Sequence, residues 1–155
     1  MQIALARYVD PYRHFCIPNC MAGYFTECDF LVVSKSGLLW EIEIKCSMAD
    51  WKADLAKHRQ YKPGWNPARF YYAYPEDNPH AQIPEWVPMD AGVLWIFERD
   101  GDPVIRPVRA AKARHRCPVS DDIKIEILRK IHLRYWLAFS SIQNTSPTTP
   151  QDEGK

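Results

Sequence analysis

Charged and apolar residues alternate along one short segment in the first third of the chain. Glu41, Glu43 and Lys45 are separated by Ile42 and Ile44, which predicts a strand with one charged face and one apolar face. An ordinary amphipathic strand with a solvated outer face has the same pattern. The pattern alone therefore leaves the role of the charged residues open.

The preceding segment gives these residues a partner strand. Residues 28–33 and 38–45 have the composition of two strands, and the loop between them ends in Gly37, which suits the left-handed position of a three-residue hairpin loop. Counting back from this loop places Asp29 opposite Glu43. On the same side Glu27 falls opposite Lys45, and the apolar side pairs Val32 with Trp40, Phe30 with Ile42 and Cys28 with Ile44.

Two opposed carboxylates repel each other unless a cation or a proton lies between them. A divalent metal would remove the repulsion at Asp29 and Glu43, and an all-oxygen ligand set favours Mg²⁺ or Mn²⁺. Such a metal can activate water and neutralise a phosphodiester, while the Lys45 ammonium orients the water or stabilises developing charge. The constellation therefore predicts phosphodiester hydrolysis.

Asp29, followed after thirteen residues by Glu43-Ile44-Lys45, resembles the motif of the PD-(D/E)xK nuclease superfamily. Within it, the chain is most similar to MmcB-like DNA repair and phage proteins. The resemblance covers residues 24–97. Besides the motif it rests on residues 27–33, 40–45, Ser47-x2-Asp50-x3-Asp54, 70–75 and 83–84 before 92–94.

The resemblance implies an α/β fold, the restriction-endonuclease-like αβββαβ core with a central mixed sheet flanked by helices. It implies metal ligands at Asp29, Glu43 and the backbone carbonyl of Ile44, with Lys45 catalytic. Cys28 stands where the superfamily name has proline. An additional carboxylate would come from Glu27 or Glu41, which could equally be solvated charges, so one or two metals remain open.

The implied activity is a metal-dependent nuclease that hydrolyses DNA phosphodiester bonds, in DNA repair, recombination or phage DNA processing. The alternative from another class is a non-catalytic nucleic-acid-binding or assembly module on the same fold. A third interpretation is a small metal-binding protein built on Cys16, Cys20 and Cys28, although these spacings match no standard zinc or iron–sulfur pattern.

The elements around the hairpin are predicted from the periodicity of apolar residues and from helix caps and turn residues. We expect a weak helix over residues 3–12, a helix over 48–60 that begins with a capping box at Ser47 and Asp50, and a last helix over 121–139. Strands are expected at 68–74 and 92–98, with an edge strand at 103–108. The aromatic residues of these strands are interpreted as core. Residues 1–142 are expected to form a single domain, followed by a disordered tail at 143–155.

The charges of the whole chain nearly cancel, with 20 Lys and Arg against 19 Asp and Glu, so any DNA contact must use a local patch. Residues 103–120 contain no acidic residue and are interpreted either as a solvated surface or as a contact for the DNA phosphate backbone. The candidate contacts are Arg106, Arg109, Lys112, Arg114 and Arg116.

The sequence contains neither a membrane-spanning run nor a secretory signal, so we expect no membrane partner. The expected location is the cytoplasm, either of a bacterium or of a host cell for a phage-encoded protein. Cutting both strands of a duplex would favour a homodimer, an option for which no interface residue is evident.

Overall fold

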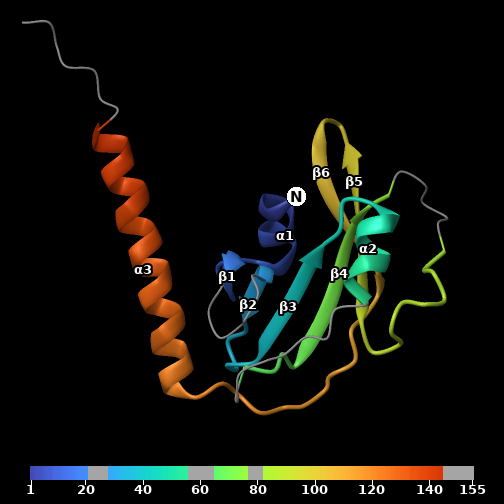
Figure 1. The fold of residues 1–155 in the computed structure, drawn as a ribbon, viewed down its shortest axis with the longest axis horizontal. Coiled ribbons are helices and arrows are strands. Elements are labelled where there is room, and N and C mark those ends of the chain that lie inside the picture. Colours follow the sequence, from blue (N-terminus) through green and yellow to red (C-terminus); the bar gives the residue numbers. More distant parts are fainter. Residues whose placement is uncertain (21–27, 56–64, 77–81, 145–155) are drawn as a thin grey trace, which may run out of the picture.

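The fold is a single six-stranded mixed sheet with helices on both faces, as seen in a computed structural model that describes residues 1–20, 28–55, 65–76 and 82–144 (Figure 1). The strands lie in the sheet in chain order. The succession of helix, three strands, helix and strand at its start confirms the expected α/β core. The elements are α1 (Gln2–Val9), β1 (Phe15–Cys20), β2 (Cys28–Val33), β3 (Leu39–Ile44), α2 (Met48–Leu55), β4 (Arg69–Pro75), β5 (Gly92–Arg99), β6 (Asp102–Arg109) and α3 (Asp121–Asn144).

The sheet combines an antiparallel and a parallel part. Strands β1, β2 and β3 pair antiparallel, β3, β4 and β5 pair parallel, and β6 returns antiparallel at the edge. A parallel pair needs a crossover connection, and α2 lies in the connection between β3 and β4. The carboxyl ends of β3, β4 and β5 therefore share one edge of the sheet.

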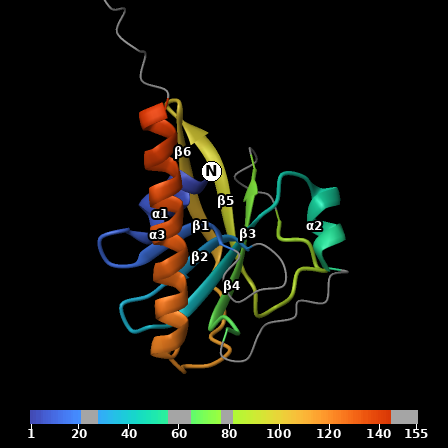
Figure 2. The ribbon, with the colours of Figure 1, turned by 60° about the vertical axis from the view of Figure 1, so that its left-hand side comes forward.

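The two faces of the sheet are covered by different helices. Leu5 of α1 packs in a cluster with Phe30 and Leu94 on one face. Ile123 and Ile127 of α3 pack with residues of β1 and β2 on the other. The second half of α3 extends beyond β1 and β2 (Figures 1 and 2).

An aromatic cluster holds α2 against the parallel strands. Trp51 is fully buried, and its ring centroid lies 5.2 Å from that of Tyr72 and 6.1 Å from that of Trp95. Tyr74 and Trp86 also contact Trp51. The interpretation of these aromatics as core is confirmed.

The hairpin has the predicted register: Phe30 lies opposite Ile42 and Val32 opposite Trp40. Its loop closes through a 2.9 Å bond from the Ser34 N–H to the Leu38 carbonyl, and Gly37 has a φ of 78°. The helix cap is also confirmed, since Ser47 Oγ accepts the Asp50 N–H at 3.0 Å.

The last helix is longer than predicted. It continues to Asn144, past both the expected helix end and the expected domain end at residue 142, because residues 140–144 contain no glycine or proline to stop it. The rest of the predicted tail and the end of the predicted 48–60 helix lie outside the described residues. Within the described ranges, no helix is both long enough and apolar enough to cross a membrane.

Candidate active site at the carboxyl end of β3

A buried ion pair lies at the carboxyl end of β3. Lys45 Nζ donates a hydrogen bond to Glu43 Oε2 at 3.0 Å, and the two residues are 4% and 5% exposed. A strand that served only as an amphipathic outer surface would leave these charges in water. Burying both charges instead carries a desolvation cost that surface charges avoid.

Asp29 joins this pair from β2. Its Oδ2 accepts the Ile44 N–H at 2.8 Å, so its carboxylate is fixed at the end of β3. The pairing of β2 with β3 begins at Phe30 and Ile42, one residue along β2 from the predicted opposition of Asp29 and Glu43.

The predicted position of Cys28 opposite Ile44 on the apolar face is wrong. Cys28 packs instead with Leu31 and Leu39 on the other face. The alternation of faces is interrupted at this end of both β1 and β2, where Asn19 has a φ of 47° and Cys20 pairs with Cys28. Counting by twos from the hairpin loop could not detect this interruption.

The predicted repulsion between the carboxylates of Asp29 and Glu43 is found in the structure. Burial raises the pKa of Asp29 above its ordinary value, and the nearby Glu43 raises this pKa further. The Ile44 N–H and the Lys45 ammonium act in the opposite direction. The Asp29 carboxylate therefore lies where additional positive charge would stabilise it.

A hollow opens beside this carboxylate. It has a volume of about 360 Å³ and is lined by Met1, Gln2, Asp29, Ile44 and Cys46. Gln2 Nε2 donates to the Asp29 carbonyl at 3.1 Å, which holds α1 at its edge. A hard divalent cation keeps several of its own waters when few carboxylates bind it, and an open hollow bordered by Asp29 and Ile44 suits such an ion.

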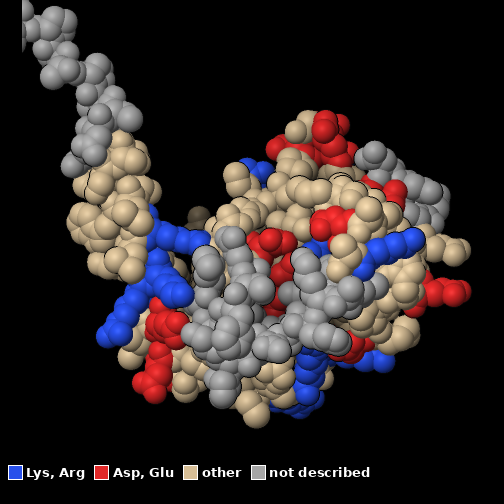
Figure 3. All heavy atoms as spheres, viewed as in Figure 1, with Lys and Arg blue, Asp and Glu red and all other residues tan. Residues whose placement is uncertain are grey.

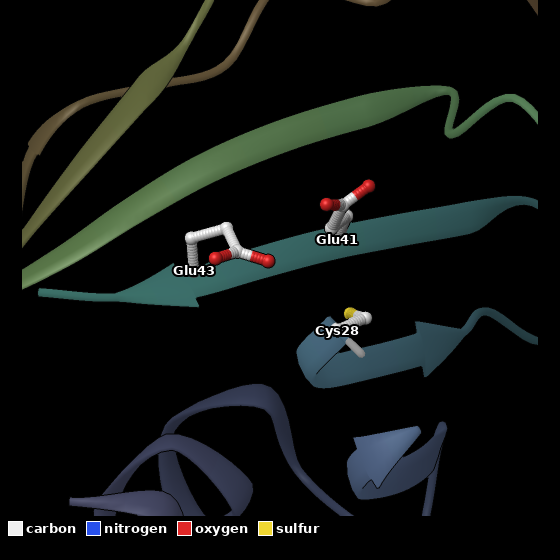
Figure 4. Close-up of side chains that lie close together, drawn as sticks. All are labelled: Cys28, Glu41 and Glu43. Atoms are coloured by element: carbon white, nitrogen blue, oxygen red, sulfur yellow. The ribbon is translucent and has the colours of Figure 1, made fainter. Parts of the chain in front are cut away.

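A second group of ligand atoms lies deeper in the sheet. One ligand atom from each of Cys28, Glu41 and Glu43 lies within 4.8 Å of the others, and all three residues are buried (Figure 4). Burial first, and then Glu41 and Glu43, raise the pKa of the Cys28 thiol well above its ordinary value. The thiol is therefore neutral and suited to donate a weak hydrogen bond rather than to act as a metal-binding thiolate.

The remaining candidate metal ligands differ in where the structure places them. Glu41 is fully buried rather than solvated, whereas Glu27 lies outside the described residues. The site built on Cys16, Cys20 and Cys28 is wrong, because Cys16 packs on the α1 face and the other two pack on the α3 face.

The part of the basic stretch that follows β6, residues 110–116, lies at the opposite end of the parallel strands. Arg114 N–H donates to the carbonyl of Ala68 before β4 begins, whereas Lys45 N–H donates to Ala73 near the end of β4. Five residue steps separate these two acceptors, which is about 16 Å along a strand. The structure therefore places this part of the stretch away from the ion pair, whereas Arg106 pairs with Trp95 toward the carboxyl ends, on the edge strand β6.

Arg109 and Arg114, two of the predicted phosphate contacts, hold neighbouring loops in place. Arg109 donates to the carbonyls of Ala91 and Pro88 at 2.8 and 2.7 Å, and Arg114 pairs with Asp90 at 2.9 Å. Lys112 and Arg116 are exposed, and Arg106 is exposed on β6. Figure 3 shows acidic atoms in the middle of the viewed face and Lys and Arg atoms at α3 and along the lower edge.

The family model described as DNA repair protein MmcB-like matches residues 1–128. The chain belongs to this MmcB-like family. The match includes the ion pair, the hollow and the basic stretch, and it ends within α3.

Among solved structures, this MmcB-like chain is similar to the SPO1766 protein of unknown function from Silicibacter pomeroyi. The two share 17% identity with a TM-score of 0.60, over 96% of this chain and 92% of the other, which shows a shared fold. No curated protein matches the sequence.

Two features of the site were not predicted from the sequence. The contact of Gln2 with Asp29 joins residues far apart in the chain, and no local pattern indicates it. The place of Cys28 beside Glu41 depends on the irregular strand end. The available signal in the sequence was Asn19, because asparagine tolerates the positive φ that it adopts here.

Proposed function

We propose that this MmcB-like protein is a metal-dependent nuclease of the PD-(D/E)xK type that hydrolyses DNA phosphodiester bonds, in DNA repair, recombination or phage DNA processing. The observation that carries the proposal is the buried Glu43–Lys45 pair next to the Asp29 carboxylate and an open hollow. Buried charges with no chemical task are costly to retain. The family description supports a DNA-related role.

The donor set fits a hard divalent cation. Asp29, Glu43 and the Ile44 carbonyl would hold Mg²⁺ or Mn²⁺ through oxygen alone. When bound, the ion supplies an acidified water and neutralises negative charge on the phosphodiester. Burial first, and then the charge of Glu43, raise the pKa of Asp29, and a bound cation would offset both effects, which supports this assignment.

The residues of the chain have separate tasks in this reaction. Glu43 Oε2 accepts the hydrogen bond that keeps Lys45 in place, and the same carboxylate would help to hold the ion. Lys45 donates a hydrogen bond toward the attacking water or the phosphate oxygen that gains charge. The Ile44 N–H fixes the rotamer of Asp29, so the ligand needs no reorganisation before it binds.

The DNA path follows from the separation of the two charged regions. About 16 Å of strand lies between the site and the loop that carries Lys112 and Arg116, and a duplex spans this length with about five base pairs. We propose that these residues contact phosphates distant from the cleaved bond. Their substitution should weaken binding and reduce its salt dependence without abolishing cleavage at saturating DNA.

The proposal is tested by incubating purified protein with supercoiled, linear and single-stranded DNA, and with RNA, in Mg²⁺, Mn²⁺ or EDTA. Cleavage that needs metal and is lost in Asp29→Asn and Glu43→Gln supports it. Lys124→Met, a change in α3 on the surface, is the matched control and should cleave normally. DNA binding without cleavage in either metal would favour the non-catalytic module instead.

A further inference from the structure

Among the residues that the structure describes, the largest group of exposed apolar side chains is on α3. Within residues 125–142, five of the large apolar side chains follow the spacing of a coiled-coil seam, three and four residues apart, with His132 at the remaining position. They are Ile125, Leu128, Tyr135, Phe139 and Ile142, with exposures of 46, 53, 61, 40 and 66%.

This seam is not the face that packs on the sheet. Ile123, Ile127 and Ile131 contact the core, and they lie on a neighbouring stripe of the helix. The seam begins beside the packed part of α3 and continues along its second half, which projects beyond β1 and β2 and where Figure 3 shows mostly uncharged atoms.

We propose that two copies of the chain associate through this seam, with their α3 helices antiparallel about a two-fold axis near residues 133 and 134. This alignment places Ile125 against Ile142, Leu128 against Phe139, and His132 against Tyr135 of the second copy. Each pair occurs twice, as an isologous interface requires.

Charge complementarity favours the antiparallel direction. In a parallel pair, the residues that flank the seam meet five positions apart, so Lys124 would face Arg129 of the second copy twice. In the antiparallel pair Arg129 faces Trp136, where a guanidinium can lie over an indole ring. Like charges are avoided and a favourable contact replaces them.

The exposed area is of the size that a stable dimer needs. Tyr135, Trp136 and Phe139 expose 61, 49 and 40% of their surfaces, which amounts to about 300 Å² for side chains of this size. A groove of about 770 Å³ continues from Leu128 to Tyr12 and Phe15, which are 99 and 62% exposed and add about 300 Å² more. Stable interfaces bury about 800 Å² per partner, and the exposed side chains of Ile125, Leu128 and Ile142 supply the remainder.

The test is the mass of the full-length protein in solution, by sedimentation or light scattering over about 1 to 100 μM, the range of micromolar affinities. We expect a mass twice the 18.1 kDa of one chain. Tyr135→Glu with Phe139→Glu should halve it. Leu133→Glu with Leu137→Glu is the matched control, because these residues are 60 and 72% exposed on another stripe, and it should remain dimeric.

The direction of the helices is tested separately. With Cys46 and Cys117 changed to Ser, oxidation should cross-link a chain carrying both Leu128→Cys and Phe139→Cys, but not a chain carrying Leu128→Cys alone. A wild-type chain that is monomeric throughout, or a monomer that sediments with vesicles of anionic lipid, overturns the proposal. None of these measurements depends on nuclease activity.

Discussion

Breaking the Glu43–Lys45 pair from one side should be far more damaging than removing both partners. The side chains are only 7 and 5% exposed and 3.0 Å apart, so Lys45→Met leaves a buried carboxylate and Glu43→Leu leaves a buried ammonium. Loss of one partner of a buried pair costs about 3–5 kcal/mol, whereas apolar residues of similar volume in place of both are often neutral.

Urea unfolding followed by tryptophan fluorescence measures these costs in metal-free protein at neutral pH. With a slope of about 2 kcal/mol per M, each single variant should lower the midpoint by about 1.5–2.5 M. The double variant should recover most of that loss, so the two single costs together should exceed the cost of the double variant by about 5 kcal/mol or more. Single variants that each cost less than about 1 kcal/mol and add in the double variant would show that the pair is effectively solvated, and would refute the reasoning.

Three further changes test the surroundings of the site. Because the pKa of Asp29 is raised in the folded state, its ionisation opposes folding as the pH rises from about 3.8 through that raised value. Asp29→Asn should therefore stabilise the metal-free protein at pH 7, and this gain should be absent below about pH 3.8. Equal urea midpoints for the wild-type chain and the variant at pH 7 would contradict this. Trp51→Ala, at a fully buried position, should cost about 3–5 kcal/mol by urea unfolding, and a cost below about 1 kcal/mol would mean that α2 is not anchored there. Gly37→Ala should cost about 1–2 kcal/mol, because its φ is 78° and the added Cβ would lie 3.1 Å from Pro118 Cβ; an unchanged melting temperature would argue against this hairpin geometry.

The hairpin and its charged residues were predictable because local rules agree there. Alternation fixed the faces of β3, Gly37 fixed the turn, and together they set the register that brings Asp29 next to Glu43. The burial of Glu41, Glu43 and Lys45 was not predictable. A charged strand face in a single sequence is typical of solvent exposure, and only the packing of the sheet decides otherwise.

The position of the basic stretch could not be predicted from its composition. Closeness in space to the site depends on which end of the parallel strands the chain passes after β6, and here it passes the amino-terminal ends. The exposure of the second apolar stripe of α3 could not be predicted either, because a helix that is apolar on two stripes is typical of one packed on both sides.

The most direct test of the central claim is the single-turnover rate of DNA cleavage in Mn²⁺ for the wild-type chain and for Lys45→Met, at a temperature where both are folded. If Lys45 acts on the attacking water or the developing charge, the rate should fall by about 10²–10⁴-fold while DNA binding is unchanged. Equal rates in the two proteins would contradict the assignment of the β3 end as the active site.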